Sequence, residues 1–146
     1  SKEFLVAEKD KTELINKLSK NHSEIIVDRT FITTLAYCYA RSKMNNTPKE
    51  YEKLLDFYVK IQDKIIFPTH VILMDVLIER SLERRSIHSK KEKYQNWFNP
   101  VFLKYFRYFY KTELKKFLPL TPLYIDTSDL VPKETAKIIN RMINNT

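Results

Sequence analysis

The sequence contains no glycine among its 146 residues. A loop that folds closely around phosphate groups depends on glycine, so a G-x-x-x-x-G-K-[ST] phosphate loop and a G-x-G-x-x-G dinucleotide turn are both excluded from this stretch of chain. The single cysteine excludes an internal disulfide and favours a reducing compartment. No run approaches the roughly 18 apolar residues that a membrane-spanning helix needs. We therefore expect a cytoplasmic protein with no membrane partner.

Apolar and basic residues are abundant. Hydrophobic residues make up 43% of the sequence, which predicts a folded chain, and its length suits one domain over residues 1–146. The 26 Lys and Arg outnumber the 18 Asp and Glu, for a formal charge of +8. This excess favours a polyanionic partner such as a nucleotide, a nucleic acid or an acidic lipid surface. An AT-rich genome, which enriches lysine, asparagine and isoleucine, is the alternative explanation.

Three short apolar runs predict buried strands, at residues 24–27, 70–76 and 122–128. Apolar residues at helical spacing predict helices between and around them, at residues 4–18, 35–44, 48–66, 79–85, 97–117 and 132–143. Thr47 followed by Pro48 is a helix-start signal. This order of elements predicts an α/β fold, a parallel sheet flanked by helices.

A charged pair follows the first apolar run directly, with Asp28 and Arg29 at its carboxyl end. Ligands of open α/β sheets bind outside the carboxyl ends of the strands, so this pair is a candidate site. The hydroxyls of residues 30–34 suit the cap of the helix that follows. Asp75, at the end of the second run, is more consistent with a helix-capping carboxylate than with a catalytic one.

The segment VDRTFITTLAY, residues 27–37, resembles the D-R-[YFH]-x-x-S-x-x-A-[YF] motif of the thymidylate kinases and, more loosely, of the deoxynucleoside kinases. The residues on motif positions are Asp28, Arg29, Thr33, Ala36 and Tyr37. Later segments match the same family in the same order, so the resemblance runs from Phe4 to Ile143. They are the end of the second run, which is M-D-V where the family has a similar L-D-V, an E-R-x-x-x-R at Glu79-Arg80 with Arg84 or Arg85, and an I-D-[AT]-S at residues 125–128.

The resemblance implies a P-loop nucleotide kinase fold, in which ATP and Mg²⁺ phosphorylate a nucleoside monophosphate. Arg29 would bind the acceptor, and Asp28 would orient it and help to hold Mg²⁺ through water. Thr33 and Tyr37 would shape the acceptor pocket, and Phe4 would stack on the base, unless it is simply part of the core. We expect the missing phosphate loop in a segment before Ser1, because residues 2–7 resemble the middle of an element.

The resemblance also implies a lid over residues 79–95 that closes on the donor phosphates. The cations that it assigns to this role are Arg80, Arg84, Arg85, Lys90 and Lys91. The sequence departs from the family in three places: Ser89-Lys90 replaces the lid Asp-Arg, Cys38 replaces a Gln, and Glu8 or Lys9 replaces an Arg that contacts the base. These departures predict a relaxed choice of base.

Two other functions remain open. A deoxynucleoside kinase would phosphorylate an alcohol, and a degenerate kinase-fold protein would bind nucleotides without catalysis; the absence of glycine favours the latter. The interleaved aromatic and basic residues of 97–117 also resemble a nucleic-acid surface. We expect those aromatics to form core instead, and we expect that nucleic acid is not the partner. A homodimer is one oligomeric state to test.

Overall fold

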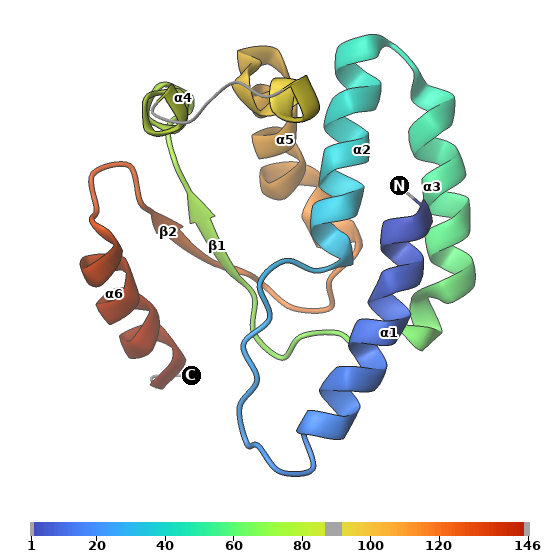
Figure 1. The fold of residues 1–146 in the computed structure, drawn as a ribbon, viewed down its shortest axis with the longest axis vertical. Coiled ribbons are helices and arrows are strands. Elements are labelled where there is room, and N and C mark those ends of the chain that lie inside the picture. The colour runs from blue at the N-terminus through green and yellow to red at the C-terminus, as the bar shows by residue number, and fades with distance from the viewer. Residues whose placement is uncertain (1, 87–91, 145–146) are drawn as a thin grey trace. The chain divides into compact units, whose positions relative to one another are not determined.

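The computed structural model describes residues 2–86 and 92–144. The chain forms two compact units, unit 1 (Ser1–Phe67) and unit 2 (Pro68–Thr146). Figure 1 follows the chain through both of them. The expectation of a single domain over residues 1–146 remains a prediction.

Unit 1 consists of three helices and a short 3-10 helix, which are α1 (Lys2–Leu18), α2 (Phe31–Asn45), α3 (Pro48–Ile61) and η1 (Gln62–Lys64). Successive helices run in opposite directions (Figure 1). The fully buried ring of Phe31 stacks on Tyr58 at 5.3 Å and meets Phe67 edge-on at 5.4 Å. These contacts place the first residue of α2 in the core of unit 1. The three predicted helices are confirmed, and α2 begins earlier than expected.

The turn between α2 and α3 is built without glycine. Asn46 takes the left-handed conformation at the end of α2, with φ 54°, and its N–H donates to the Ser42 carbonyl. Asparagine is the residue that best replaces glycine at such a position. Pro48 occupies the first turn of α3 as predicted. Thr47 stands at the N-cap position of α3, but its hydroxyl makes no cap bond and has no hydrogen-bond partner in the described part of the chain.

Residues 24–27 do not form the predicted strand. The Ile26 side chain is 91% exposed, and within the described ranges this segment pairs with no strand. Strand formation requires a neighbour for the backbone N–H and C=O groups, which β-branched side chains alone do not provide. The apolar run therefore lies in an extended loop between α1 and α2.

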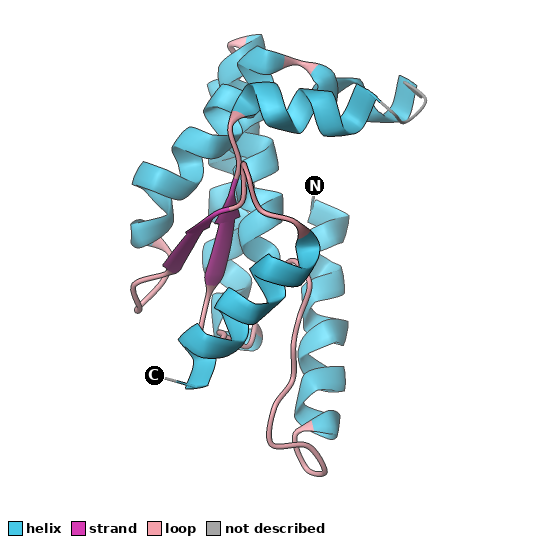
Figure 2. Ribbon diagram, turned by 90° about the vertical axis from the view of Figure 1, so that its left-hand side faces the viewer, coloured by secondary structure: helices cyan, strands magenta, loops and turns pink. Residues whose placement is uncertain are grey.

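Unit 2 contains two parallel strands, β1 (Ile72–Asp75) and β2 (Leu123–Asp126), which lie side by side in Figure 2. The register pairs Ile72 with Leu123 and Asp75 with Asp126. Both strands are shorter than the predicted runs. Because they are parallel, their two carboxyl ends meet at one edge and bring the two aspartates next to each other.

Three helices accompany these strands in unit 2: α4 (Ile78–Ser86), α5 (Pro100–Tyr108) and α6 (Pro132–Asn144). The described residues are thus mostly helical and contain only two short strands. The predicted parallel sheet flanked by helices, of the P-loop kinase type, is therefore wrong. None of the helices described is both long enough and apolar enough to cross a membrane, as expected.

The helix predicted at residues 97–117 is divided into four pieces. They are the 3-10 helix η2 (Glu92–Phe98), α5, the π-helical turn η3 (Phe109–Glu113) and the 3-10 helix η4 (Leu114–Lys116). The Asn99 side chain starts α5 by accepting the Val101 amide at 2.9 Å. Phe102 and Phe109 are fully buried, and Trp97 meets the Phe102 ring edge-on at 5.3 Å. The prediction that these aromatics form core is confirmed for Phe102 and Phe109, whereas Tyr108 is half-exposed.

The core of unit 1 gives the first testable prediction. We expect Phe31→Ala to lower the free energy of unfolding by about 3–5 kcal/mol, because it removes a buried ring and leaves a cavity. Phe4→Ala is the matched control, since the Phe4 side chain is 67% exposed and its loss should change stability by less than about 0.5 kcal/mol. Urea denaturation followed by circular dichroism measures both. Equal losses would show that Phe31 is not part of the core.

Candidate functional site

The loop before α2 places three predicted site residues around the first turn of that helix. Asp28 and Arg29 are exposed in the loop, and the Thr33 amide donates to the Thr30 carbonyl at 2.9 Å. Thr30 has an extended backbone, and its Oγ1 accepts the Ile32 amide at 3.4 Å, which caps α2. The amino end of a helix carries partial positive charge, so this end of α2 favours an anion.

Arg29 has the left-handed backbone conformation, with φ 63°. Apart from Asn46, it is the only described residue with a positive φ. A side chain with a Cβ in this region costs about 1–2 kcal/mol relative to the ordinary conformation. Within residues 2–86 and 92–144, no carboxylate forms an ion pair with the Arg29 guanidinium. A strained arginine with its charge unmatched is typical of a ligand site rather than of a structural contact.

Lys11 is a positioning residue that the sequence reasoning missed. Its ammonium group donates to Glu8 Oε1 at 2.7 Å and to the Arg29 carbonyl at 3.1 Å, so α1 holds the backbone of the strained residue. Glu8 is only 8% exposed and is engaged by this ion pair rather than open to a base. The spacing of Glu8 and Lys11 suggests a helix-surface pair, but only the tertiary structure brings Lys11 to the loop.

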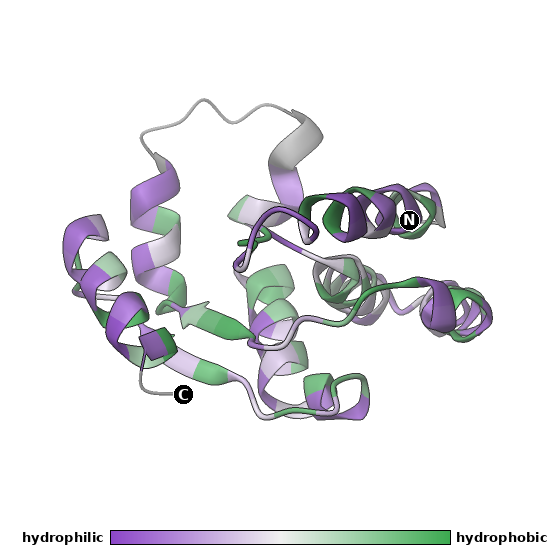
Figure 3. Cartoon of the chain, turned by 90° about the horizontal axis from the view of Figure 1, so that it is seen from below, coloured by the Kyte–Doolittle hydropathy of each residue, from purple (hydrophilic) through white to green (hydrophobic). Residues whose placement is uncertain are grey.

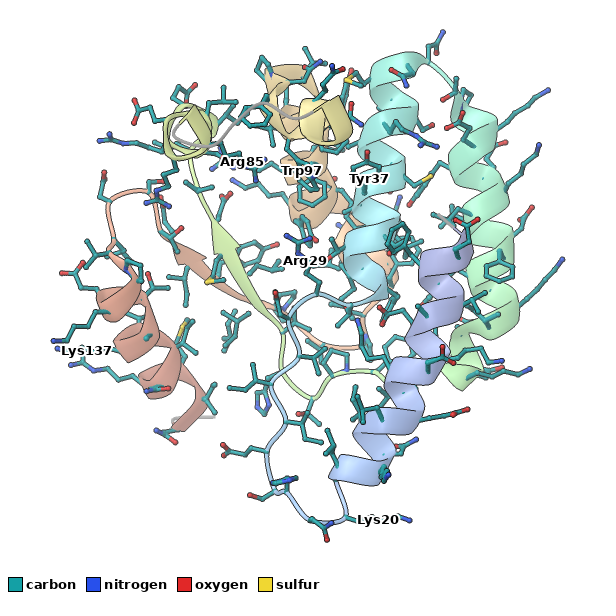
Figure 4. The ribbon with its side chains drawn as sticks, in the orientation of Figure 1. Lys20, Arg29, Tyr37, Arg85, Trp97 and Lys137 are labelled. Carbon is teal, nitrogen blue, oxygen red and sulfur yellow. The ribbon has the colours of Figure 1, made fainter. Side chains whose placement is uncertain are left out.

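Phe4 and Tyr37 lie on the two helices that flank this loop. The exposure of Phe4 rules out the alternative that it is a core residue. The helices α1 and α2 run in opposite directions (Figure 1). The step from Lys11 back to Phe4 along α1 covers about 10 Å. It therefore runs in the same direction as the step from Arg29 to Tyr37 along α2 (Figure 4). Thr33 and Tyr37 are four residues apart and share one face of α2. Unit 1 thus presents Phe4, Arg29, Thr33 and Tyr37 on adjoining elements.

The three lid arginines lie on α4, where Figure 3 shows mostly hydrophilic residues. Arg80 pairs with Glu83 at 3.0 Å and with Asp129 at 3.5 Å. Arg84 donates to the carbonyls of Thr127 and Ser128, at 2.7 and 3.1 Å. All of these partners belong to unit 2, so Arg80 and Arg84 attach α4 to the loop after β2.

Arg85 contacts the aromatic core of unit 2. Its Nη1 donates to the Trp97 carbonyl at 2.8 Å, and its guanidinium lies 5.1 Å from the centre of the Trp97 ring (Figure 4). This is the geometry of a cation–π contact. Lys90 and Lys91 lie outside the described residues.

A second polar cluster, also missed by the sequence reasoning, occupies the carboxyl ends of β1 and β2. Arg107 donates to both carboxylate oxygens of Asp75, from Nε and Nη2 at 2.8 Å each, and Lys111 approaches at 3.2 Å. Burial alone would raise the pKa of Asp75, but the hydrogen bonds from Arg107 and Lys111 outweigh it and hold that pKa below its ordinary value. The predicted cap role is therefore not the main one, since Asp75 joins β1 to α5.

The neighbouring aspartate has a different partner. Asp126 Oδ1 accepts the Ser128 hydroxyl at 2.6 Å and the Ser128 amide at 2.9 Å. These two hydrogen bonds lower the pKa of Asp126. The Ser128 hydroxyl oxygen in turn accepts the Leu77 amide at 3.0 Å, which links the segments that leave the two strands.

No cluster of three or more potential metal ligands occurs among the described residues. Asp28 is a single exposed carboxylate. Mg²⁺ usually keeps several waters and binds one or two carboxylates together with substrate phosphates. Asp28 therefore suits the predicted water-mediated contact only when phosphate oxygens supply the other ligands.

The strain at Arg29 can be measured by comparing two substitutions. Both Arg29→Gly and Arg29→Ala remove the guanidinium, but only glycine accepts a φ of 63° without a steric penalty. We expect the glycine variant to be more stable than the alanine variant by about 1 kcal/mol in urea denaturation. The same pair of substitutions at Arg41, inside α2, should favour alanine by a similar amount. A more stable Arg29→Ala would contradict the left-handed conformation.

The Asp75–Arg107 pair predicts a dependence of stability on pH. Because the pKa of Asp75 is lowered on folding, its contribution is fully present above the ordinary aspartate pKa and is lost as pH falls through the lowered value. We expect Asp75→Asn to cost about 1–3 kcal/mol at pH 7, with the difference from wild type shrinking below about pH 4. Asp129→Asn is the control, since its pair with Arg80 is exposed and should contribute little. A difference that does not vary with pH would show that Asp75 is not ionised in the fold.

Comparison with known proteins identifies no relative. No protein family, no curated protein and no solved structure matches this chain. The function is therefore inferred from the motif around Arg29 and from the geometry of the residues themselves.

Proposed function

We propose that this chain binds a nucleoside monophosphate through unit 1 and takes part in phosphoryl transfer to it from ATP, with Mg²⁺. The observation that carries the proposal is Arg29, a strained and exposed arginine at the amino end of α2 with no acidic partner in the described part of the chain. The thymidylate kinase-like motif supports it, because Arg29 occupies the arginine position of that motif.

The surrounding residues suit the parts of a nucleoside monophosphate. The planar guanidinium of Arg29 can donate two parallel hydrogen bonds to a phosphate, and the partial positive charge of the α2 amino end adds to the attraction. Thr33 offers a hydroxyl one turn into the helix. The exposed Phe4 ring offers a flat surface for a base. In phosphoryl transfer the protein mainly positions groups and neutralises developing charge, which is what these side chains supply.

A second candidate is nucleotide binding without transfer. The observation that favours it is the engagement of Arg84 by two backbone carbonyls and of Arg80 by two carboxylates. For these side chains to bind donor phosphates, they would have to exchange those partners. The absence of glycine from the sequence favours the same candidate. A deoxynucleoside kinase is the third candidate and differs in that its acceptor carries no phosphate for Arg29.

The acceptor base is expected to be a pyrimidine, with weak discrimination. Rejecting a wrong base requires buried polar groups that this base leaves unpaired. Glu8 is occupied by Lys11, and Cys38 stands where the related kinases have glutamine. Thymidine monophosphate is the first acceptor to test. A cytoplasmic location is part of the same proposal, and the single cysteine of the sequence fits such a reducing compartment.

The proposal is tested by a panel of nucleosides and nucleoside monophosphates, with ATP and Mg²⁺, measuring binding by calorimetry and ADP formation by a coupled assay. We expect thymidine monophosphate to bind and thymidine not to. Arg29→Ala should lower phosphoryl transfer by about 10³-fold or more, and Arg29→Lys should lie between, since it keeps the charge but loses the planar fork. Arg41→Ala, farther along α2 and paired with Glu50, is the matched control and should be unaffected.

The outcomes separate the candidates. Binding that depends on Arg29 without ADP formation would select nucleotide binding alone, and phosphorylation of thymidine itself would select the deoxynucleoside kinase. An Arg29→Ala variant within a few-fold of wild type in binding and rate would remove Arg29 from the site. A preference of a thousandfold for thymidine monophosphate would contradict the relaxed base choice.

A further inference from the structure

One face of α6 carries only basic and amide side chains. These are Lys133, Lys137, Asn140, Arg141 and Asn144, all exposed, and they are named here the basic face of α6. The three cations repeat every four residues and so lie in a row along the helix. Figure 4 shows Lys137 pointing away from the strands of unit 2. The apolar side chains of α6 lie on the opposite side of the helix and are half-buried: Ile138, Ile139, Met142 and Ile143.

Nothing in the described part of the chain neutralises these three cations. No ion pair or hydrogen bond within residues 2–86 and 92–144 involves their charged groups. The single acid of α6, Glu134, instead accepts the Val131 amide at 3.1 Å and caps its own helix. By contrast, the cations of α4 and α5 that lie near the strand ends are engaged, as Arg84 and Arg107 show.

The charge of unit 2 adds to this local pattern. Unit 2 contains 14 Lys and Arg against eight Asp and Glu, so it holds most of the formal charge of +8. A row of cations on a surface with the same overall sign attracts a polyanion and is poorly suited to an ordinary protein surface of mixed charge.

Contrary to the expectation from the sequence that nucleic acid is not a partner, we propose that the basic face of α6 binds the phosphate backbone of a nucleic-acid duplex. The three cations span about 12 Å of helix, from a rise of about 1.5 Å per residue. One strand of a duplex presents a phosphate about every 3.4 Å, so a groove edge of this length offers a phosphate to each cation. The amides of Asn140 and Asn144 are further donors to phosphate oxygens. The contact is sequence-independent, because it reaches phosphates and not bases.

The composition of this face distinguishes a duplex from two other polyanions. A single strand is bound through aromatic side chains that stack on its bases, and the basic face of α6 has none. A helix that lies in a membrane surface buries its apolar side in the lipid, whereas the apolar side of α6 is half-buried in unit 2. The proposed duplex surface is independent of the nucleotide site, whose residues belong to unit 1.

The test measures binding of the full chain to a fluorescent 20-base-pair DNA duplex of mixed sequence, by anisotropy, between 50 and 200 mM salt. The variant Lys133→Gln/Lys137→Gln/Arg141→Gln removes the row. Each lost phosphate contact lowers the slope of log K against log salt by about 0.9. We expect the slope to fall in magnitude by about 3. The factor by which the binding constant drops between 50 and 200 mM salt should then be about 40-fold smaller for the variant than for the wild type.

The matched control is Lys49→Gln/Lys53→Gln/Lys60→Gln, which removes the same charge from exposed positions on α3, where acidic residues alternate with the lysines. It should keep nearly the whole wild-type slope. Lys137→Glu, a single change, should weaken binding by itself, and thermal unfolding checks that all variants fold. Equal losses in both triple variants, or no duplex binding by the wild type, would overturn the proposal. Loss of binding to phosphatidylserine vesicles but not to the duplex would also overturn it.

Discussion

Every turn of this chain has to be made without glycine, and that constraint shapes the parts of the structure that carry function. Where a left-handed residue is needed at the end of α2, Asn46 supplies it at small cost. Where one is needed before α2, the residue is Arg29, for which the conformation is unfavourable. The surroundings offset that strain, because Lys11 bonds the Arg29 carbonyl and Phe31 anchors the start of α2 in the core.

Unit 2 depends on a comparable arrangement at the ends of its two strands. A two-stranded sheet of four residues each is weak by itself and needs cover from helices. Arg107 supplies one connection through its paired hydrogen bonds to Asp75, and Arg84 supplies another through the carbonyls after β2. The sequence alone assigns Arg80 and Arg84 to phosphate binding and Asp75 to helix capping. In the structure these three charged side chains also connect helices to the strands or to the loop after β2.

Both proposed sites have in common that their charges are left without such a structural partner in the described residues. Arg29 in unit 1 and the row on α6 in unit 2 meet this condition. A paired charge already has an oppositely charged or hydrogen-bonding partner inside the protein, whereas an exposed charge without one is available to a ligand. Arg29 suits a single phosphate held at a helix end. The α6 row suits a line of phosphates.

The sequence by itself determined most helices, both strands that form and the aromatic core around Phe102, because periodicity of apolar residues is a local property. It also singled out Arg29 from its motif. Tertiary structure decided what depends on partners. Residues 24–27 have the composition of a strand but lie exposed, so the predicted sheet does not form. Lys11 reaches Arg29, and Arg107 reaches Asp75, across 18 and 32 residues of sequence, a separation that no local pattern encodes.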